Sequence, residues 1–131
     1  MMTRPSVEEW LKEAKTEKDA KKCGMYLTHI GTVRQTARKR VRGGDTSVPA
    51  VAGMEFDFDK DAVDAAIRRT LQMKGIYCVK VWLNKGMLQT GDEIMQVLIG
   101  GDIRDHVIEA LTLLVAELKT NCVKETEIYA C

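Results

Sequence analysis

The sequence predicts an α+β domain in which helices cover a mostly antiparallel sheet. Its 131 residues, 45% of them hydrophobic, are enough to form one core. Segments with helical and with strand-like apolar spacing follow one another in the order α-β-β-α-β-β-α. No internal repeat or low-complexity segment interrupts this order. The order is typical of an α+β fold, so we expect a single domain over residues 1–131.

The first two elements are predicted to be a helix at residues 6–22 and a strand at residues 25–33. Ser6 and Glu9 form a capping pair at the start of the helix. Gly24 is expected to end it. The sequence MYLTHIGTV that follows is rich in β-branched and aromatic residues, which favour a strand.

The middle of the chain is predicted to hold a loop, two strands and a second helix. Residues 35–48 are basic and glycine-bearing and have no clear apolar period, so we expect a mobile loop there. Partial alternation predicts a strand at residues 50–58. A helix is expected at 59–74, ended by Gly75, and a strand at 76–83.

The last third of the chain is predicted to form a buried strand, a Gly-Gly turn and a helix. After a turn at residues 84–86, the β-prone run at residues 94–99 precedes Gly100 and Gly101. Asp102 is expected to cap the next helix. Its buried stripe is predicted to contain Val107, Leu111, Leu114 and Leu118. Residues 120–131 are interpreted as a short C-terminal tail with strand-like ends.

A cation lies near each end of this last helix. Lys119, in the last turn, complements the negative C-terminal end of the helix dipole, whereas Arg104, in the first turn, opposes the positive end. Arg104 therefore needs a compensating partner. An external phosphate or carboxylate is one candidate, and an ion pair with Asp102 or Asp105 is the alternative.

Charge and cysteine usage exclude several classes of protein. Lysine and arginine number 20 against 19 acidic residues, so a nucleic-acid-binding surface spanning the domain is not expected. Without an apolar run of signal or membrane-spanning length, we expect a cytoplasmic protein. The four cysteines lack C-x-x-C spacing and do not cluster with His29 or His106, so no metal site is expected. Cys78 is predicted to be a core thiol, and Cys122 and Cys131 are expected to be exposed.

Three segments of the chain resemble the MoaE family, the large, catalytic subunit of molybdopterin synthase. The first is IGTVR at residues 30–34, and the second is GDEIMQVLIGGDIRDHVIEAL at 91–111. The third is LKT at 118–120, with Lys124 beyond it. Their order and spacing agree with that family over about residues 7–125.

The resemblance implies an α/β hammerhead-like fold and an enzyme that transfers sulfur. In that family a homodimer binds a small ubiquitin-like partner, MoaD-like, at each end and forms a heterotetramer. The partner's C-terminal thiocarboxylate delivers sulfur to cyclic pyranopterin monophosphate, and two rounds give molybdopterin. The transfer requires no metal or redox cofactor.

By motif match, the resemblance implies that Lys119 and Lys124 are catalytic and that Arg34 and Arg104 bind the phosphate and the pterin. His29 stands where the family has an aromatic residue and is a further candidate for substrate binding. Both substrates are anionic, which suits a cationic pocket. A lysine crowded by other cations can also act as a nucleophile near neutral pH.

The chain departs from the family pattern at several positions. Ile103 stands where the family usually has a histidine, and the interval between Lys119 and Lys124 is shorter by about two residues. A noncatalytic paralogue that binds a pterin or a ubiquitin-like partner is therefore an alternative. Nucleic-acid binding through RKRVR at residues 38–42 is a third, less favoured reading, since no aromatic residues interleave with the charges.

Arg104 and Lys119 are too far apart along one helix to bind the same small substrate. Their 15-residue separation corresponds to about 22 Å at the helical rise. In a twofold dimer, the Arg104 end of one subunit can meet the Lys119 end of the other. We therefore predict a pocket shared between subunits, with Lys119, Lys124 and Arg34 from one chain and Arg104 from its mate.

Overall fold

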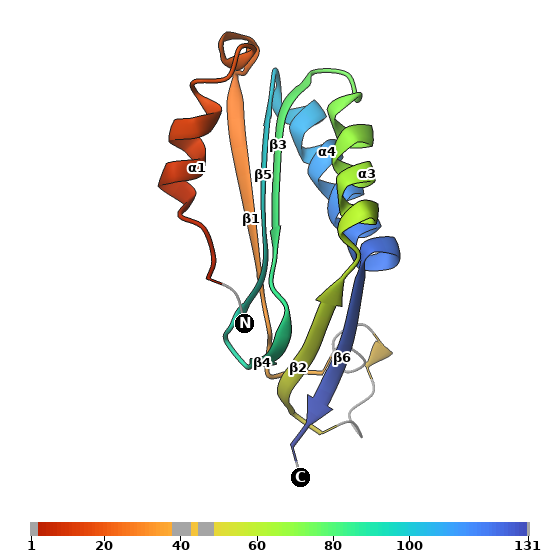
Figure 1. Cartoon of the computed structure of the whole chain (residues 1–131). Coiled ribbons are helices and arrows are strands. Elements are labelled where there is room, and N and C mark those ends of the chain that lie inside the picture. The colour runs from red at the N-terminus through yellow and green to blue at the C-terminus, as the bar shows by residue number, and fades with distance from the viewer. Residues whose placement is uncertain (1–2, 38–42, 45–48, 131) are drawn as a thin grey trace.

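The computed structural model of the chain describes residues 3–37, 43–44 and 49–130. Their order confirms the predicted α+β class (Figure 1). Most of the loop predicted at residues 35–48 lies outside the described residues. The elements are α1 (Val7–Ala14), the 3₁₀ turn η1 (Ala20–Lys22), β1 (Met25–Thr32), β2 (Val51–Phe58), α3 (Lys60–Leu71), β3 (Ile76–Leu83), β4 (Gly86–Gln89), β5 (Glu93–Gly101), α4 (Arg104–Glu117), the π-helical turn η2 (Leu118–Cys122) and β6 (Val123–Tyr129).

The strands form two antiparallel sheets rather than one. The first sheet has the order β1-β5-β3 and the second the order β4-β2-β6. β4 was not predicted, and it begins in the predicted turn at residues 84–86. Residues 120–131 were predicted to be a tail, whereas Val123–Tyr129 pairs with β2 along its length. The charged sequence of β6 gives little local signal, because the strand is held by a partner distant in sequence.

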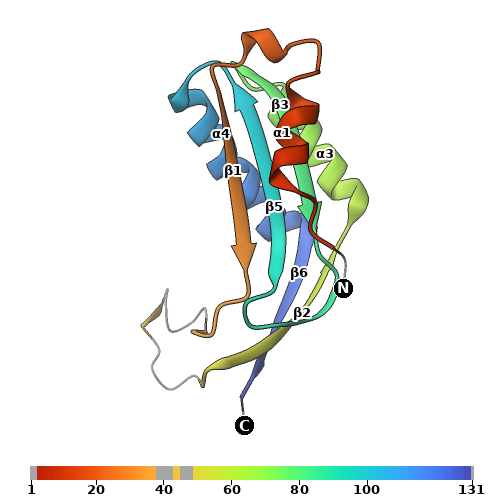
Figure 2. The same ribbon diagram turned by 90° about the vertical axis from the view of Figure 1, so that its left-hand side faces the viewer.

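The first sheet is the middle layer of the domain. Figures 1 and 2 show α1 on one face of this sheet and α3 and α4 on the other. Side chains alternate along β5, so Leu98 packs under α1 with Ala14 and Cys78. Val97 and Ile99 join the larger core on the face covered by α3 and α4. The second sheet extends beyond the end of α4, where η2 leads into β6 (Figure 1).

The first helix is shorter than predicted. α1 ends at Ala14 instead of near Lys22, and a turn and η1 follow it. Ser6 caps the helix as expected, its hydroxyl accepting from the Glu9 amide at 3.3 Å. Residues 15–22 are almost all charged and offer no apolar face to the sheet, so packing does not extend the helix.

α3 has its N-cap at Asp59, where the helix was predicted to begin, but it ends at Leu71, before the predicted Lys74, and α4 has a different cap from the predicted one. Asp59 caps α3 by accepting from the amides of Asp61 and Ala62, and Gly75, with φ of 79°, reverses the chain after the helix ends. Asp102 does not cap α4. The N-cap is Ile103, and Asp102 instead accepts from the Ile103 amide at 2.7 Å and contacts Nδ1 of His106 at 2.7 Å. Within the described ranges, no helix is long and apolar enough to cross a membrane.

Candidate functional site

The π-helical turn η2 presents Lys119 at the end of α4. Leu118 and Cys122, at the two ends of the turn, are 0% and 3% exposed and anchor it in the core. The prediction that Cys122 is exposed was therefore wrong. Its thiol lies between helix and strand, and burial raises its pKa. Lys119 is half-buried between these anchors, and π-helical turns of this kind are often found at functional sites.

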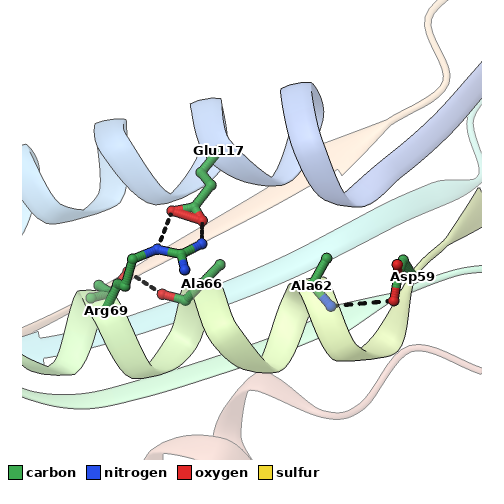
Figure 3. A network of polar contacts seen from close by, with 6 residues as sticks. Asp59, Ala62, Ala66, Arg69 and Glu117 are labelled. Carbon is green, nitrogen blue, oxygen red and sulfur yellow. Dashed lines mark hydrogen bonds and ion pairs between the residues drawn. The ribbon is translucent and has the colours of Figure 1, made fainter.

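An ion pair between α3 and α4 fixes the start of this turn. The Arg69 guanidinium contacts both carboxylate oxygens of Glu117, the last residue of α4 (Figure 3). The Nε–Oε1 distance is 3.3 Å. The Glu117 carboxylate raises the pKa of Arg69. Because a two-point contact restrains orientation as well as distance, Arg69 positions the helix end from which Lys119 projects.

Lys119 and Arg34 line the same cavity, which has a volume of about 410 Å³. Arg34 follows Val33, whose backbone is held by hydrogen bonds to Asp92 and Gly91 at 2.9 and 2.8 Å. The Arg34 side chain is exposed, and its Nε donates to the Thr36 carbonyl at 3.0 Å. Two cations predicted from separate motifs therefore lie on one cavity, of a size typical for small ligands.

The rest of the cavity wall contains acidic residues that were not predicted to belong to the site. Glu125, Glu127 and Tyr129 of β6 line it, with Met54 and Ile94 among the apolar lining. Tyr129 donates to Glu127 Oε1 at 3.3 Å, and partial burial together with that carboxylate raises the pKa of Tyr129. The sequence signal was the alternation in VKETEIY, which has meaning only once β6 is known to be a strand.

Strand pairing places Lys124 on the opposite face of β6 from this cavity. Glu125 is opposite Phe56, which is 1% exposed, so both face the protein interior. Lys124 is opposite Asp57 and is exposed. It lines a separate depression of about 280 Å³ with Asp57. Within one chain, the two predicted catalytic lysines are therefore not brought together.

His29 lies on the face of β1 that is covered by α4. It is opposite Val97, a core residue, and is half-buried. Burial lowers its pKa from the usual 6.5, and the charge of Lys119 lowers it further. His29 is thus near enough to Lys119 to sense its charge, although it does not line the cavity.

Arg104 is the first residue of α4, at the opposite end of the helix from Lys119. Its side chain is exposed, and no residue within the described ranges forms an ion pair with it. The alternative pairing with Asp102 or Asp105 is therefore not seen. The Asp102 carboxylate instead contacts His106, which lowers the pKa of Asp102. His106 is half-buried.

α4 carries apolar residues on its outer side as well as on its inner side. Val107, Ala110 and Leu114 are buried against the sheet. Ile108 and Leu113 are 47% and 53% exposed. Asp105, Glu109 and Thr112 are exposed between them, so the outer surface of α4 is mixed, with a polar centre and an apolar residue on each flank.

The family model for MoaE protein matches residues 3–121. The chain belongs to the MoaE family. Family membership supports a role in molybdenum cofactor biosynthesis. No curated protein matches the chain in sequence.

Solved MoaE structures share the fold at low sequence identity. Molybdopterin synthase from Staphylococcus aureus is 14% identical, with a TM-score of 0.72, covering 98% of this chain and 89% of that one. The MoaE protein from Burkholderia ambifaria is 17% identical, with a TM-score of 0.71 and coverage of 98% and 83%. A complex of subunits 1 and 2 of molybdopterin-converting factor from Helicobacter pylori is 18% identical, with a TM-score of 0.63 and coverage of 96% and 84%.

Proposed function

We propose that this MoaE-family chain is the catalytic subunit of a molybdopterin synthase. It would transfer sulfur from the thiocarboxylated C-terminus of a small ubiquitin-like partner to cyclic pyranopterin monophosphate. The observation that carries this proposal is the shared cavity of Lys119 and Arg34 at the end of α4. Both cations belong to motifs that resemble the family's site, and the cavity suits a ligand with a phosphate.

In this proposal the two cations have different tasks. Arg34 keeps the rest of its planar guanidinium for the substrate phosphate, because only its Nε is used by Thr36. Lys119 is the nucleophile that attacks or holds the pterin intermediate covalently. In each net transfer, sulfur and oxygen change places. The substrate exchanges a carbon–oxygen for a carbon–sulfur bond, and the partner's thiocarboxylate becomes a carboxylate, without net oxidation or reduction.

We further propose that two copies of the chain form a homodimer through the outer face of α4. Ile108 and Leu113 supply exposed apolar surface on the two flanks of this face. An isologous contact between antiparallel α4 helices would bring the exposed Arg104 of one chain to the Lys119 end of its mate. His29 and Lys124 remain predicted site residues. The second depression, lined by Lys124, would need to be completed by another chain.

The ubiquitin-like partner is proposed from the same family relation. The Helicobacter pylori structure named above is a complex of two subunits of molybdopterin-converting factor. For the present chain, a partner at each end of the homodimer would form a heterotetramer. The cytoplasmic location expected from the sequence is part of this proposal.

A noncatalytic paralogue is the second candidate function. The observation that favours it is the composition of the cavity, where Glu125 and Glu127 of β6 lie on the lining and Lys124 does not. Such a protein would bind the pterin or the partner without turnover.

Reconstitution separates the two functions. The chain is mixed with cyclic pyranopterin monophosphate and a thiocarboxylated ubiquitin-like partner, and molybdopterin is measured. We expect product from the native chain and a loss on the order of 10²- to 10⁴-fold for Lys119→Ala, the usual range for removing a catalytic group. Binding without product would favour the paralogue. Full activity of Lys119→Ala, with its dimer intact, would overturn the assignment of Lys119.

A further inference from the structure

One wall of the Lys119 cavity is acidic, and the proposed sulfur transfer does not use it. β6 places Glu125 and Glu127 on the lining, whereas Lys119 and Arg34 come from η2 and from the chain after β1. Among the described residues, the cavity therefore presents Lys119 and Arg34 on one side and Glu125 on the other, with no ion pair between them.

Glu125 is the carboxylate of this wall that is available to a ligand. Glu127 accepts a hydrogen bond from Tyr129. Glu125 is half-buried, and no side chain within residues 3–37, 43–44 and 49–130 forms a hydrogen bond or ion pair with its carboxylate. Its strand partner Phe56 is buried and apolar, so one side of Glu125 is already shielded from water. Partial burial of a carboxylate without a partner is unfavourable, and a ligand that donates hydrogen bonds would relieve the cost.

We propose that Glu125 binds the aminopyrimidinone edge of a pterin and so determines the specificity of the cavity. This inference rests on the proposed function for the identity of the ligand. In a pterin, the ring N3–H and the neighbouring 2-amino group donate side by side, which matches the two oxygens of one carboxylate. The ligand's phosphate lies at the other wall, with Arg34 and Lys119. Two chemically different ends of one molecule are thereby bound by two oppositely charged walls.

In this proposal the negative charge of Glu125 also discriminates between pteridines with and without a 2-amino group. A dioxopteridine carries a carbonyl oxygen in place of the 2-amino group, and that oxygen would repel the Glu125 carboxylate. A site that depends on such a hydrogen bond discriminates strongly against an analogue that lacks the donor.

The test is a fluorescence titration of the full-length chain with two unphosphorylated probes, 2-amino-4-oxopteridine and 2,4-dioxopteridine. We expect the native chain to prefer the amino compound by at least about tenfold, as for a charged hydrogen bond. Glu125→Gln should weaken binding of the amino compound about 10- to 100-fold and remove the preference, because an amide can donate to the dioxo compound. Glu55→Gln is the matched control. Glu55 is exposed on β2 and does not line the cavity, so its substitution should leave the preference unchanged.

The outcomes distinguish this inference from the proposed function. An unchanged preference in Glu125→Gln, or no binding of the amino compound by the native chain, would overturn the inference even if molybdopterin is formed. A preference that depends on Glu125 would support it even if no molybdopterin is formed, and in that case only the proposed enzyme activity fails. Equal losses in Glu125→Gln and Glu55→Gln would assign the effect to net charge and overturn the specific role of Glu125.

Discussion

The two ends of α4 differ in how much of a site a single chain builds there. At the C-terminal end, η2, the first sheet and β6 surround Lys119 with a cavity of about 410 Å³. At the N-terminal end, Arg104 is exposed and has no ion-pair partner within the described ranges. The helix therefore joins a cavity formed within one chain to an exposed cation. This difference is the basis for proposing that the Arg104 end completes a pocket with another subunit.

The largest expected effect is the recovery of molybdopterin synthesis when two inactive variants, one altered at each end of α4, are mixed. Lys119→Ala and Arg104→Ala should each lose most molybdopterin synthesis, because each damages both pockets of its homodimer. After subunit exchange, half of the dimers are mixed, and each mixed dimer has one intact pocket. Activity should return to about a quarter of the native value if each pocket combines residues from two chains.

Mixed dimers can be purified with two different affinity tags, which provides the control for exchange. Purified mixed dimers with no recovered activity would show that Arg104 and Lys119 serve the same pocket within one chain. Full activity of Arg104→Ala alone would show instead that Arg104 has no role in the reaction.

Loss of the dimer should be the next largest effect. Ile108→Asp introduces a charge at the outer face of α4, and we expect dissociation into monomers, observed by sedimentation velocity. Molybdopterin synthesis should fall with the dimer if the pocket is shared. Met87→Asp is the matched control, because Met87 is 62% exposed on β4, away from α4. A stable dimer with Ile108→Asp would place the interface elsewhere.

A smaller effect on kcat is expected from breaking the Arg69–Glu117 contact at the C-terminal end of α4. Arg69→Met removes the contact with Glu117 but keeps most of the aliphatic side chain. We expect kcat to fall severalfold, because misplacement of Lys119 reduces catalysis without unfolding the domain. Arg68→Met removes the same charge from the neighbouring residue and should leave kcat unchanged. Equal kinetics for the two variants would argue against a positioning role for Arg69.

The smallest effect concerns His29 and the pH dependence of stability. Burial and then Lys119 lower the pKa of His29 in the folded protein below its usual 6.5. The unfolded chain therefore binds a proton more readily, and the stability contributed by neutral His29 is present above pH 6.5 and lost as pH falls through the lowered value. In urea unfolding between pH 7.5 and 5, His29→Gln should show a shallower decline than the native chain. A decline of equal slope would remove His29 as a cause.

Local patterns predicted the first sheet better than the second. β1, β3 and β5 come from runs such as IYCVKVWL, whose residues favour strands wherever they are placed. β6 contains Lys124, Glu125 and Glu127, and its identity depends on pairing with β2, more than 60 residues earlier in the sequence. The helix starting at Arg104 was found from its apolar stripe. Its cap was not, because the Asp102 side chain contacts His106 instead of the helix amides.

The same distinction explains which parts of the candidate site could be found from the sequence. Arg34 and Lys119 were selected from motifs about 85 residues apart and line one cavity, an agreement that no local pattern could guarantee. Lys124 was selected by the same resemblance, yet it lies on the other face of β6. Glu125 was missed because alternation of charges has no meaning until the strand, and the face of it that is buried, are known.

Because η2 leads directly into β6, the length of η2 determines which β6 side chains, acidic or basic, face the cavity. Successive residues of a strand point to opposite faces, so a one-residue shift of β6 against β2 would exchange the β6 side chains on the two faces of the strand. Glu125 and Glu127 would then face solvent, and Lys124 would move to the face of β6 that lines the cavity. A single insertion or deletion in the turn could thus convert an acidic wall into one bearing a lysine while leaving the helices and the first sheet untouched. The five-residue length of η2, Leu118–Cys122, therefore determines the charge of the cavity wall as much as the sequence of β6 does.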